Sequence, residues 1–415
     1  MEKILIIEDS KSLNLLFSTH VKRELGFEVV SAFSYKEAKG ILEKDSDFFI
    51  ALSDIKLPDA LNGEVIDLVL SFNVSTIVVT GGISDEIQDA ICSKKIIDYV
   101  LKGNPDNLIY LLSLIKRIKL NETIKVLVAE DSSTARKIIT ELLKVHKYIV
   151  YDCKNGEEAL SILKENPDIK MLITDYHMPK INGFDLISEV RHKYNKNQMV
   201  IIGTSSQEDD RLSSKFIKYG ANDFITKPFR AEEFYCRITQ NIQNLEYIET
   251  IKDISHRDYL TNLYNRRYFF EAVNRLVALS KREKKKFTVA MLDLDHFKKI
   301  NDIYGHQAGD LVLQKAASIL IKRFRETDVV ARFGGEEFCV FAYDMRPKDA
   351  KEVFEVVRKT IMKDVIKIDE HELKVTVSIG ICTKSSDSIE EMINEADANL
   401  YQAKETGRNR IVFDF

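Results

Sequence analysis

Continuous apolar runs that end in acidic residues mark the first half of the chain. Residues 3–7 are such a run and lead into Glu8-Asp9-Ser10, and residues 125–129 lead in the same way into Glu130-Asp131-Ser132. Runs of this kind are typical of strands that a parallel sheet buries on both faces. The repeat therefore predicts two copies of one folding unit.

Each copy continues with short apolar strands that alternate with amphipathic helical patterns. The second copy shows such a helical pattern from Ala135 to Leu143. Further strands end at Asp54, Thr80 and Lys102 in the first copy and at Asp175, Thr204 and Lys227 in the second. This alternation predicts a doubly wound, flavodoxin-like α/β fold with a parallel sheet in each copy.

Polar residues gather at the carboxyl ends of these strands, where doubly wound sheets bind their ligands. Three acids meeting there would repel one another unless a divalent cation lay between them, and oxygen-only ligands suit Mg²⁺. Asp175 can then accept a phosphoryl group whose oxygens Thr204 and Lys227 stabilise. The pocket residues are Glu130, Asp131, Asp175, Thr204 and Lys227 in the second copy and Glu8, Asp9, Asp54, Thr80 and Lys102 in the first.

The second copy resembles the receiver domains of response regulators. Its acidic pair, Asp175 with Pro179 and Gly183 behind it, Thr204 and Lys227-Pro228 all stand at receiver spacing. The first copy departs from that pattern: Gly63 comes one residue late after Asp54, Thr80 precedes two glycines, and glycine replaces proline after Lys102. We therefore rank Asp175 above Asp54 as phosphoacceptor, although both copies keep the acids, the threonine and the lysine.

A helical pattern without proline or glycine follows the second copy. Its apolar positions stand three or four residues apart, at Ile238, Ile242, Leu245, Ile248, Ile251 and Ile254. The pattern predicts one helix with an apolar stripe. This helix either packs on its own receiver or pairs with a second chain. We favour a parallel coiled coil, which would be short because the spacing drifts from a strict heptad after Leu245.

The last part of the chain predicts a different site. A strand over residues 287–292 ends in Asp293-Leu294-Asp295, and the strands 329–333 and 338–341 flank Gly334-Gly335-Glu336-Glu337. Two glycines between strands predict a hairpin turn with positive φ. If the first strand lies beside this hairpin, Asp293, Glu336 and Glu337 meet at one edge and can bind one or two Mg²⁺ ions that gather triphosphate oxygens.

Two cations are expected to complete that site. Lys404 and Arg408 stand four residues apart on a helix predicted from Ala396 to Lys404, so they should face the same way. Both could then hold the β- and γ-phosphates of a nucleotide.

Nearly all of residues 250–415 resemble the GGDEF diguanylate cyclases, which implies an α+β, palm-like domain. The matching motifs lie at residues 293–298, 301–302, 305–306, 309–310, 334–338, 378–380, 396–397, 401–404 and 407–409. The chain as a whole is similar to the PleD-like response regulators, with two receivers ahead of the cyclase domain. The resemblance implies that two GTP molecules become cyclic di-GMP and two pyrophosphates.

The resemblance also implies roles for single residues. Asp293, the Leu294 carbonyl and Glu336 would hold Mg²⁺ or Mn²⁺ with help from Glu337. Glu336 or Glu337 would help deprotonate the 3′-hydroxyl, and Lys298 would support the transition-state charge. The expected substrate contacts are Asn301, His306, Asp310, Gly334, Gly335, Lys404 and Arg408, with His306 equally open to a structural role. Asn301 and Asp310 would read guanine, since a carboxylate can accept from the N1–H and N2–H₂ donors that adenine lacks.

The resemblance implies partners as well. Each domain would hold one GTP, so ring closure needs a homodimer, and a histidine kinase or phosphotransfer protein would phosphorylate the receivers. Arg325 and Asp328 stand where the family binds cyclic di-GMP as an inhibitor, with Arg358 a candidate second arginine. An adaptor that binds GTP or cyclic di-GMP without turnover is the alternative.

Length and composition agree with this outline. A chain of 415 residues with 45% hydrophobic and 30% charged residues predicts several soluble domains, and a net charge of −4 argues against nucleic-acid binding. Its scattered cysteines and the lack of a long apolar run predict a cytoplasmic protein without a membrane span. We predict receivers over residues 1–120 and 121–236, a helical connector over 237–257 and a cyclase domain over 258–415.

Overall fold

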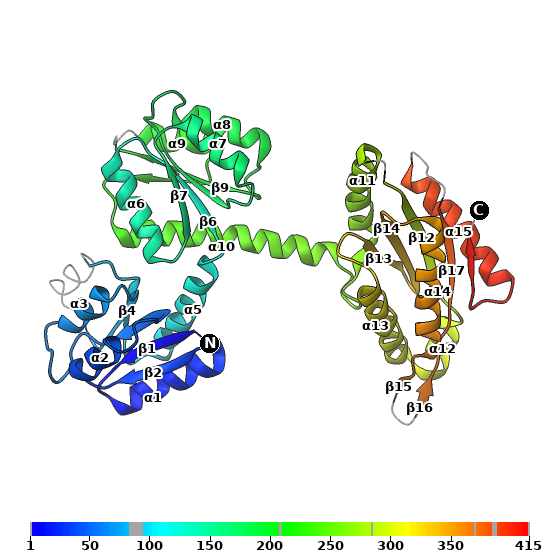
Figure 1. The fold of residues 1–415 in the computed structure, drawn as a ribbon, viewed down its shortest axis with the longest axis horizontal. Helices are drawn as coiled ribbons and strands as arrows, with labels where there is room; N and C mark the ends of the chain where they lie inside the picture. The colour runs from blue at the N-terminus through cyan, green and yellow to red at the C-terminus, as the bar shows by residue number, and fades with distance from the viewer. Residues whose placement is uncertain are drawn as a thin grey trace. The chain divides into compact units, whose positions relative to one another are not determined.

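The computed structural model describes residues 2–82, 94–206, 210–283, 285–368, 371–383 and 388–413. It divides into two compact units, Met1–Ile248 and Glu249–Phe415. The first unit contains two parallel sheets with separate cores (Figure 1). We call its two parts the first module, residues 2–121, and the second module, residues 125–248. The second unit, residues 249–415, is called the C-terminal unit.

The first module has a five-stranded parallel sheet in the order β2-β1-β3-β4-β5. Its strands are β1 (Lys3–Ile7), β2 (Glu28–Ala32), β3 (Ile50–Ser53), β4 (Thr76–Thr80) and β5 (Asp98–Leu101). Its helices are α1 (Lys11–His20), η1 (Val21–Leu25), α2 (Tyr35–Leu42), α3 (Glu64–Ser71) and α5 (Pro105–Asn121). Apolar residues of α2 and α3 pack on one face of the sheet and those of α1, η1 and α5 on the other. The predicted parallel α/β fold is therefore present.

The second module repeats this sheet order, as β7-β6-β8-β9-β10. Its strands are β6 (Lys125–Ala129), β7 (Ile149–Cys153), β8 (Met171–Asp175), β9 (Val200–Ser205) and β10 (Asp223–Thr226). Its helices are α6 (Ser133–Val145), α7 (Gly156–Glu165), α8 (Gly183–Lys193), α9 (Asp210–Tyr219) and α10 (Ala231–His256). The apolar faces of α6 and α10 cover one side of the sheet.

Helix α10 contains the predicted connector and begins earlier than expected. Ile238, Ile242 and Leu245 are at most 3% exposed and belong to the core of the second module. This half of the stripe packs on its own module, as one of the two sequence interpretations proposed. Ile251 and Ile254 further along are 65% and 71% exposed. The coiled-coil interpretation is thus confined to the exposed half.

The C-terminal unit is built on a six-stranded sheet in the order β11-β13-β14-β12-β17-β18. Its strands are β11 (Tyr264–Asn265), β12 (Phe287–Leu294), β13 (Val329–Gly334), β14 (Glu337–Tyr343), β17 (Val377–Cys382) and β18 (Ile411–Phe413). Its helices are α11 (Arg266–Glu283), α12 (Phe297–Tyr304), α13 (His306–Arg323), α14 (Pro347–Lys363) and α15 (Ile389–Glu405). The strands β15 (Ile366–Ile368) and β16 (His371–Leu373) form a separate antiparallel pair.

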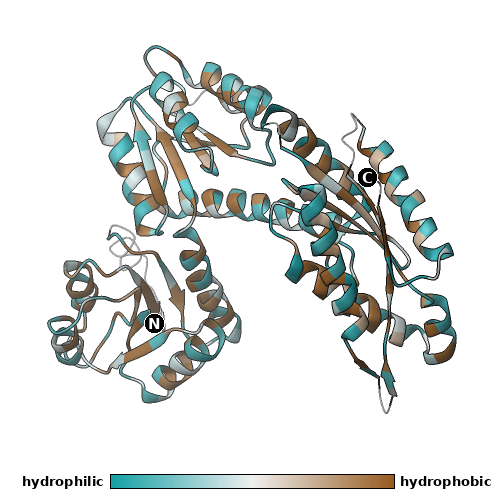
Figure 2. Ribbon diagram, turned by 45° about the vertical axis from the view of Figure 1, so that its right-hand side comes forward, coloured by the Kyte–Doolittle hydropathy of each residue, from teal (hydrophilic) through white to brown (hydrophobic). Residues whose placement is uncertain are grey.

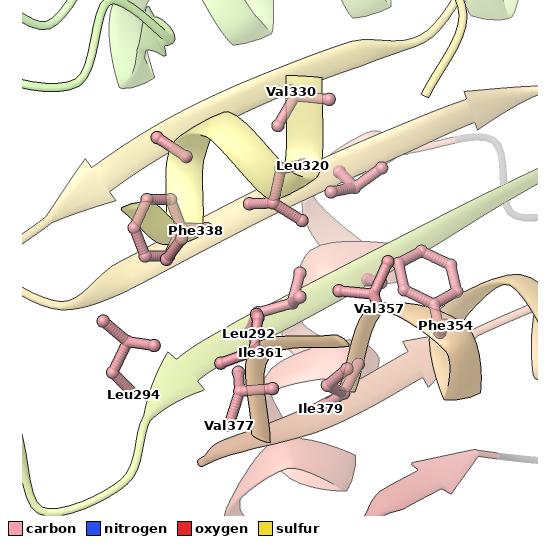
Figure 3. Packing of buried hydrophobic residues seen from close by; sticks show 14 of the residues in the cluster. Leu292, Leu294, Leu320, Val330, Phe338, Phe354, Val357, Ile361, Val377 and Ile379 are labelled. Carbon is pink, nitrogen blue, oxygen red and sulfur yellow. The ribbon is translucent and has the colours of Figure 1, made fainter. Parts of the chain in front are cut away.

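Both faces of this sheet are covered. Residues of α12, α13 and α14 pack on one face, where Figure 3 shows Leu320, Phe354 and Val357 beside strand residues, and α11 and α15 pack on the other. Gly380 of β17 allows α15 to lie directly on the sheet, because a Cβ there would come within 2.1 Å of the Ala396 carbonyl oxygen.

The hydropathy pattern follows this layering. Strand ribbons are mostly hydrophobic in Figure 2, whereas the helices alternate between hydrophobic and hydrophilic residues. Helices that cover a sheet need only one apolar face, so this alternation is the expected one. Within the described residues, no helix combines the length and the apolar character that crossing a membrane requires.

Candidate functional site

The first acidic pocket lies at the carboxyl end of the first sheet and consists of Glu8, Asp9 and Asp54. One ligand oxygen from each acid lies within 4.8 Å of the others. Lys102 donates to Asp54 Oδ2 at 2.5 Å and lies 2.6 Å from Glu8 Oε2. Thr80, which ends β4, is 4% exposed. The structure thus brings the predicted acids and the lysine together.

The second acidic pocket consists of Glu130, Asp131 and Asp175, and again one ligand oxygen from each acid lies within 4.8 Å of the others. Lys227 bonds both Glu130 and Asp175, at 2.6 Å to Asp175 Oδ1, and the backbone N–H of His177 donates to Asp175 Oδ2 at 2.7 Å. The pocket repeats the arrangement of the first module.

Burial makes both pockets costly for negative charge. It raises the pKa of Glu8 and of Glu130, against the lowering effect of the lysine that each acid contacts. Divalent cations such as Mg²⁺ prefer oxygen ligands, and these acids supply only oxygens. A cation would also reduce the repulsion between the carboxylates and favour their ionised form. Either pocket therefore fits such an ion.

The glycine behind each phosphoacceptor candidate has a different physical basis. A Cβ on Gly183 would come within 2.3 Å of the Asp175 carbonyl oxygen, so the second module needs glycine for close backbone approach. Gly63 has more room but a φ of +80°, which favours glycine for conformational reasons. The one-residue shift seen in the sequence thus changes the loop behind the first pocket without dispersing its acids.

The third group of acids surrounds the β13–β14 hairpin, and we call it the hairpin site. Gly334 and Gly335 have φ angles of +154° and +51°, as the predicted turn requires. In the pairing of β12 with β14, Asp293 lies opposite Glu337, and the Leu294 N–H points to the Glu336 carbonyl oxygen at 3.4 Å. The predicted edge of acids is therefore present.

The acids of the hairpin site are less tightly gathered than those of the two pockets. Among the described residues, groups of three ligand atoms within 4.8 Å are found in the modules and not at Asp293, Glu336 and Glu337. Lys404 Nζ instead lies 2.7 Å from Asp293 Oδ2. Burial raises the pKa of Asp293 to about 6, with Lys404 opposing the shift and the two glutamates adding to it. Such a carboxylate, beside the Leu294 carbonyl and Glu336, fits a divalent cation.

Helices α12 and α13 carry the residues expected to contact the substrate. Lys298 and Asn301 are three residues apart on α12, and His306 and Asp310 are four apart on α13, so each pair shares a helix face. Within the described chain, Asn301 Oδ1 is buried without a hydrogen-bond donor. A Cβ on Gly309 would come within 2.0 Å of that oxygen, so a larger residue there would push the Asn301 amide aside.

The prediction that Lys404 and Arg408 share one helix is wrong. Helix α15 ends at Glu405, and Gly407 and Arg408 have φ angles of +118° and +57°. The glycine stops the helix by adopting a conformation that helices exclude. Arg408 therefore belongs to a turn behind α15.

Two supports of the hairpin site were not predicted. Arg332 donates to the Gly335 carbonyl oxygen at 2.8 and 2.9 Å and pairs with Asp258 at 3.0 Å, which fixes the glycine turn. Asp295 is 5% exposed and accepts from Thr376, Ser378 and the Asn409 N–H. The motif containing Asp295 was visible in the sequence, but its distant partners were not.

The expected product-inhibition residues differ in accessibility. Arg325 is exposed, whereas Asp328 is 8% exposed and accepts from the backbone N–H groups of Arg325 and Tyr343, each at 2.9 Å. Burial raises the pKa of Asp328. Arg358 is engaged elsewhere, with Glu355 and Asn409.

Comparison with known proteins defines the class of this chain. Residues 255–410 match the family model of the diguanylate cyclase GGDEF domain, and residues 126–239 match that of the response regulator receiver domain. A solved structure titled a probable two-component system response regulator/GGDEF domain protein is 33% identical, with a TM-score of 0.52, and matches 59% of this chain and 100% of its own. The chain belongs to the response regulators that combine a receiver domain with a GGDEF domain.

The chain matches only part of the length of its individual relatives. It is 28% identical over 300 residues to response regulator PleD of Caulobacter vibrioides, and the match spans 69% of this chain and 65% of PleD. It is 39% identical over 169 residues to the probable diguanylate cyclase DgcT of Escherichia coli, which spans 40% of this chain and 37% of that protein.

Proposed function

We propose that the chain is a phosphorylation-controlled diguanylate cyclase that converts two GTP molecules into cyclic di-GMP and two pyrophosphates. The observation that carries the proposal is the register of β12 against the hairpin, which sets Asp293 opposite Glu337 beside a turn without side chains. Because glycine has no Cβ, a triphosphate can come closer to its backbone than to the backbone of any other residue.

The chain's own groups divide the work as follows. Mg²⁺ or Mn²⁺ held by Asp293, the Leu294 carbonyl and Glu336 supplies, when bound, positive charge for the triphosphate and a lower pKa for the attacking hydroxyl. Glu336 or Glu337 takes the 3′-hydroxyl proton, and Lys298, Lys404 and Arg408 bind phosphate charge. The buried acceptor Asn301 Oδ1 and the Asp310 carboxylate accept from guanine, which supports GTP over ATP.

We further propose that both modules are receiver domains, with Asp175 and Asp54 as phosphoacceptors. The support is shared geometry: three acids, a lysine on two of them and a buried threonine in each module. Asp175 remains the first choice, because its module carries the receiver spacing throughout. The phosphoryl donor would be a histidine kinase or a phosphotransfer protein.

The reaction requires a homodimer, because each domain holds one GTP and the two 3′-hydroxyls attack each other's α-phosphates. The exposed stripe of Ile251 and Ile254 on α10 supports a short helical contact between copies. Such a contact would raise the effective concentration of one cyclase domain near the other. Arg325 with Asp328 remains the proposed site for inhibition by cyclic di-GMP.

One observation favours a second candidate, a non-catalytic adaptor that binds GTP or cyclic di-GMP. Lys404 pairs with Asp293 at 2.7 Å, and among the described residues the ligand oxygens of Asp293, Glu336 and Glu337 do not all lie within 4.8 Å of one another. In a cyclase this arrangement must change when nucleotide binds, whereas an adaptor could retain it.

The test is incubation of purified protein with GTP and Mg²⁺, with and without beryllofluoride as a phosphoryl mimic. We expect cyclic di-GMP and pyrophosphate in a ratio of one to two, more product with the mimic, and none from ATP. Nucleotide binding without product under both conditions would establish the adaptor instead.

A further inference from the structure

We propose that Asp295 is a positioning residue that holds the Arg408 turn in the conformation that binds the outer phosphates of GTP. This inference rests on the proposed function, because it assigns a role within the same site. It concerns a carboxylate that neither holds the cation nor touches the nucleotide in the scheme above.

The Arg408 turn, residues 406–409, has a backbone that needs external support. Gly407, Arg408 and Asn409 have φ angles of +118°, +57° and +45° in succession. Positive φ is uncommon for residues other than glycine, and arginine adopts it less readily than asparagine. Arg408 in particular therefore calls for support from neighbouring groups.

Asp295 provides that support from the strand side. Its Oδ2 accepts from the Asn409 N–H at 3.0 Å and from Thr376 Oγ1 at 2.6 Å, and its Oδ1 accepts from Ser378 Oγ at 2.6 Å. The carboxylate is 5% exposed, so these three donors replace the water it has lost. Hydrogen bonds to an ionised acceptor are stronger than those between neutral groups.

Arg358 of α14 holds the other side of Asn409. Its NH1 group donates to Asn409 Oδ1 at 2.6 Å and to the Asn409 carbonyl oxygen at 3.1 Å, while Glu355 binds the rest of the guanidinium. Asn409 is thus bonded through its N–H, its carbonyl oxygen and its side chain. Its neighbour Arg408 also has its own N–H bonded to the Ala403 carbonyl oxygen of α15, at 3.0 Å.

The position of Asp295 in the chain gives this support its functional meaning. It stands two residues after Asp293, at the end of the strand that carries the proposed cation ligands. One carboxylate therefore links the cation-binding strand to the turn that carries a proposed phosphate ligand. Loss of the link should impair binding of the β- and γ-phosphates and leave binding of guanine and the α-phosphate intact.

The experiment compares two probes on the full chain by calorimetry with Mg²⁺. These are the guanosine α,β-methylene triphosphate, which cannot react, and GMP, which lacks the outer phosphates. We expect Asp295→Ala to lower the affinity for the triphosphate analogue by about 10- to 100-fold, the range for losing one charged phosphate contact. The affinity for GMP should not change. Asp295→Asn should recover most of the loss, because an amide oxygen can still accept from the Asn409 N–H.

Two further variants separate positioning from general stability. Thr376→Val removes a donor from the same carboxylate without touching Asn409, and we expect it to bind both probes as the parent does. The double variant Arg408→Ala/Asp295→Ala should bind the triphosphate analogue as tightly as Arg408→Ala alone, because both changes remove the same contact. If Asp295→Ala does not fold, Arg358→Ala removes the opposite support and should weaken the triphosphate analogue alone.

The outcomes distinguish the two proposals. If Asp295→Ala loses affinity equally for both probes, or binds both as the parent does, the positioning role is overturned while the cyclase proposal stands. If the parent protein binds neither probe and forms no product from GTP, the proposed function fails and the inference fails with it.

Discussion

The two acidic pockets and the hairpin site use similar residues in different states of assembly. In each pocket a lysine contacts two carboxylates, and the three acids still meet within 4.8 Å. At the hairpin site Lys404 pairs with Asp293, and within the described part of the chain the ligand oxygens of Asp293, Glu336 and Glu337 do not all lie within that distance of one another. In the pockets the acids stand at the ends of adjacent parallel strands, whereas the hairpin site takes Asp293 from the end of β12, Glu336 from the glycine turn and Glu337 from the start of β14. The pocket acids therefore already stand close enough to share a cation, and the hairpin acids would have to draw together to do so.

The largest expected effect comes from the hairpin acids. Glu336→Gln keeps the size of the side chain and removes its charge, and we expect cyclic di-GMP synthesis to fall by about 10³-fold. Product formation with GTP and Mg²⁺ measures the loss. The matched change Glu326→Gln on the exposed segment after α13 should leave the rate unaltered. Activity above a tenth of the parent rate in Glu336→Gln would contradict the assigned site.

The next effect separates the two pockets. Asp175→Asn should abolish the increase in cyclase rate that beryllofluoride produces. This increase is expected to be roughly tenfold, an ordinary size for coupling between two sites. Asp54→Asn should reduce stimulation less, because the first module departs from the receiver spacing. Cyclase rates with and without the mimic give both values. Equal losses in the two variants would show that the pockets act together, and the reverse order would make Asp54 the dominant acceptor.

A smaller effect follows from the pKa of Asp293, which burial raises to about 6. A cation needs the ionised carboxylate, so apparent Mn²⁺ affinity should fall roughly tenfold per pH unit below pH 6. Lys404→Met should move this midpoint to higher pH, because Lys404 lowers the pKa. Titrations without nucleotide, in chains whose pockets carry Asp54→Ala and Asp175→Ala, measure both effects.

The same pKa shift has a consequence for stability. Because the pKa is raised on folding, the stabilising contribution of Asp293 is complete below about pH 4 and is lost as the pH rises through 6. A midpoint near pH 4 in the Mn²⁺ titration would contradict the burial of this carboxylate.

The smallest effect concerns Gly309. In Gly309→Ala the new Cβ would meet Asn301 Oδ1 at 2.0 Å and displace the amide. We expect the KM for GTP to rise by about tenfold with kcat within a factor of two, the pattern for lost ground-state binding. Steady-state kinetics measures both constants. A fall in kcat without a change in KM would assign Asn301 to the transition state instead.

Local patterns predicted most of the fold and the acids of all three sites. Strand ends at Asp54, Asp175 and Asp293 and the Gly334-Gly335 turn are encoded by neighbouring residues, so the sequence reveals them. The end of α15 is encoded locally as well, because Gly407 is a common helix stop, and the same glycine indicates that Arg408 lies behind the helix.

Contacts between distant segments were out of reach of such reasoning. Asp295 meets Ser378, Lys404 meets Asp293, and half of the α10 stripe packs into the second module. Each depends on how helices dock on a completed sheet. Periodicity shows that a stripe is apolar, but it does not show which surface covers the stripe.

The contact between Lys404 and Asp293 bears on how the proposed cyclase would respond to ionic strength. The Lys404 ammonium balances the Asp293 carboxylate at a distance of 2.7 Å. In the proposed reaction a cation held by Asp293 would take the place of this ammonium, which would then be available to the phosphates of the nucleotide. Nucleotide binding would thus exchange one counter-ion of Asp293 for another, with little change in local charge. Substrate affinity should accordingly vary less with added salt than the charge of a nucleoside triphosphate alone would suggest.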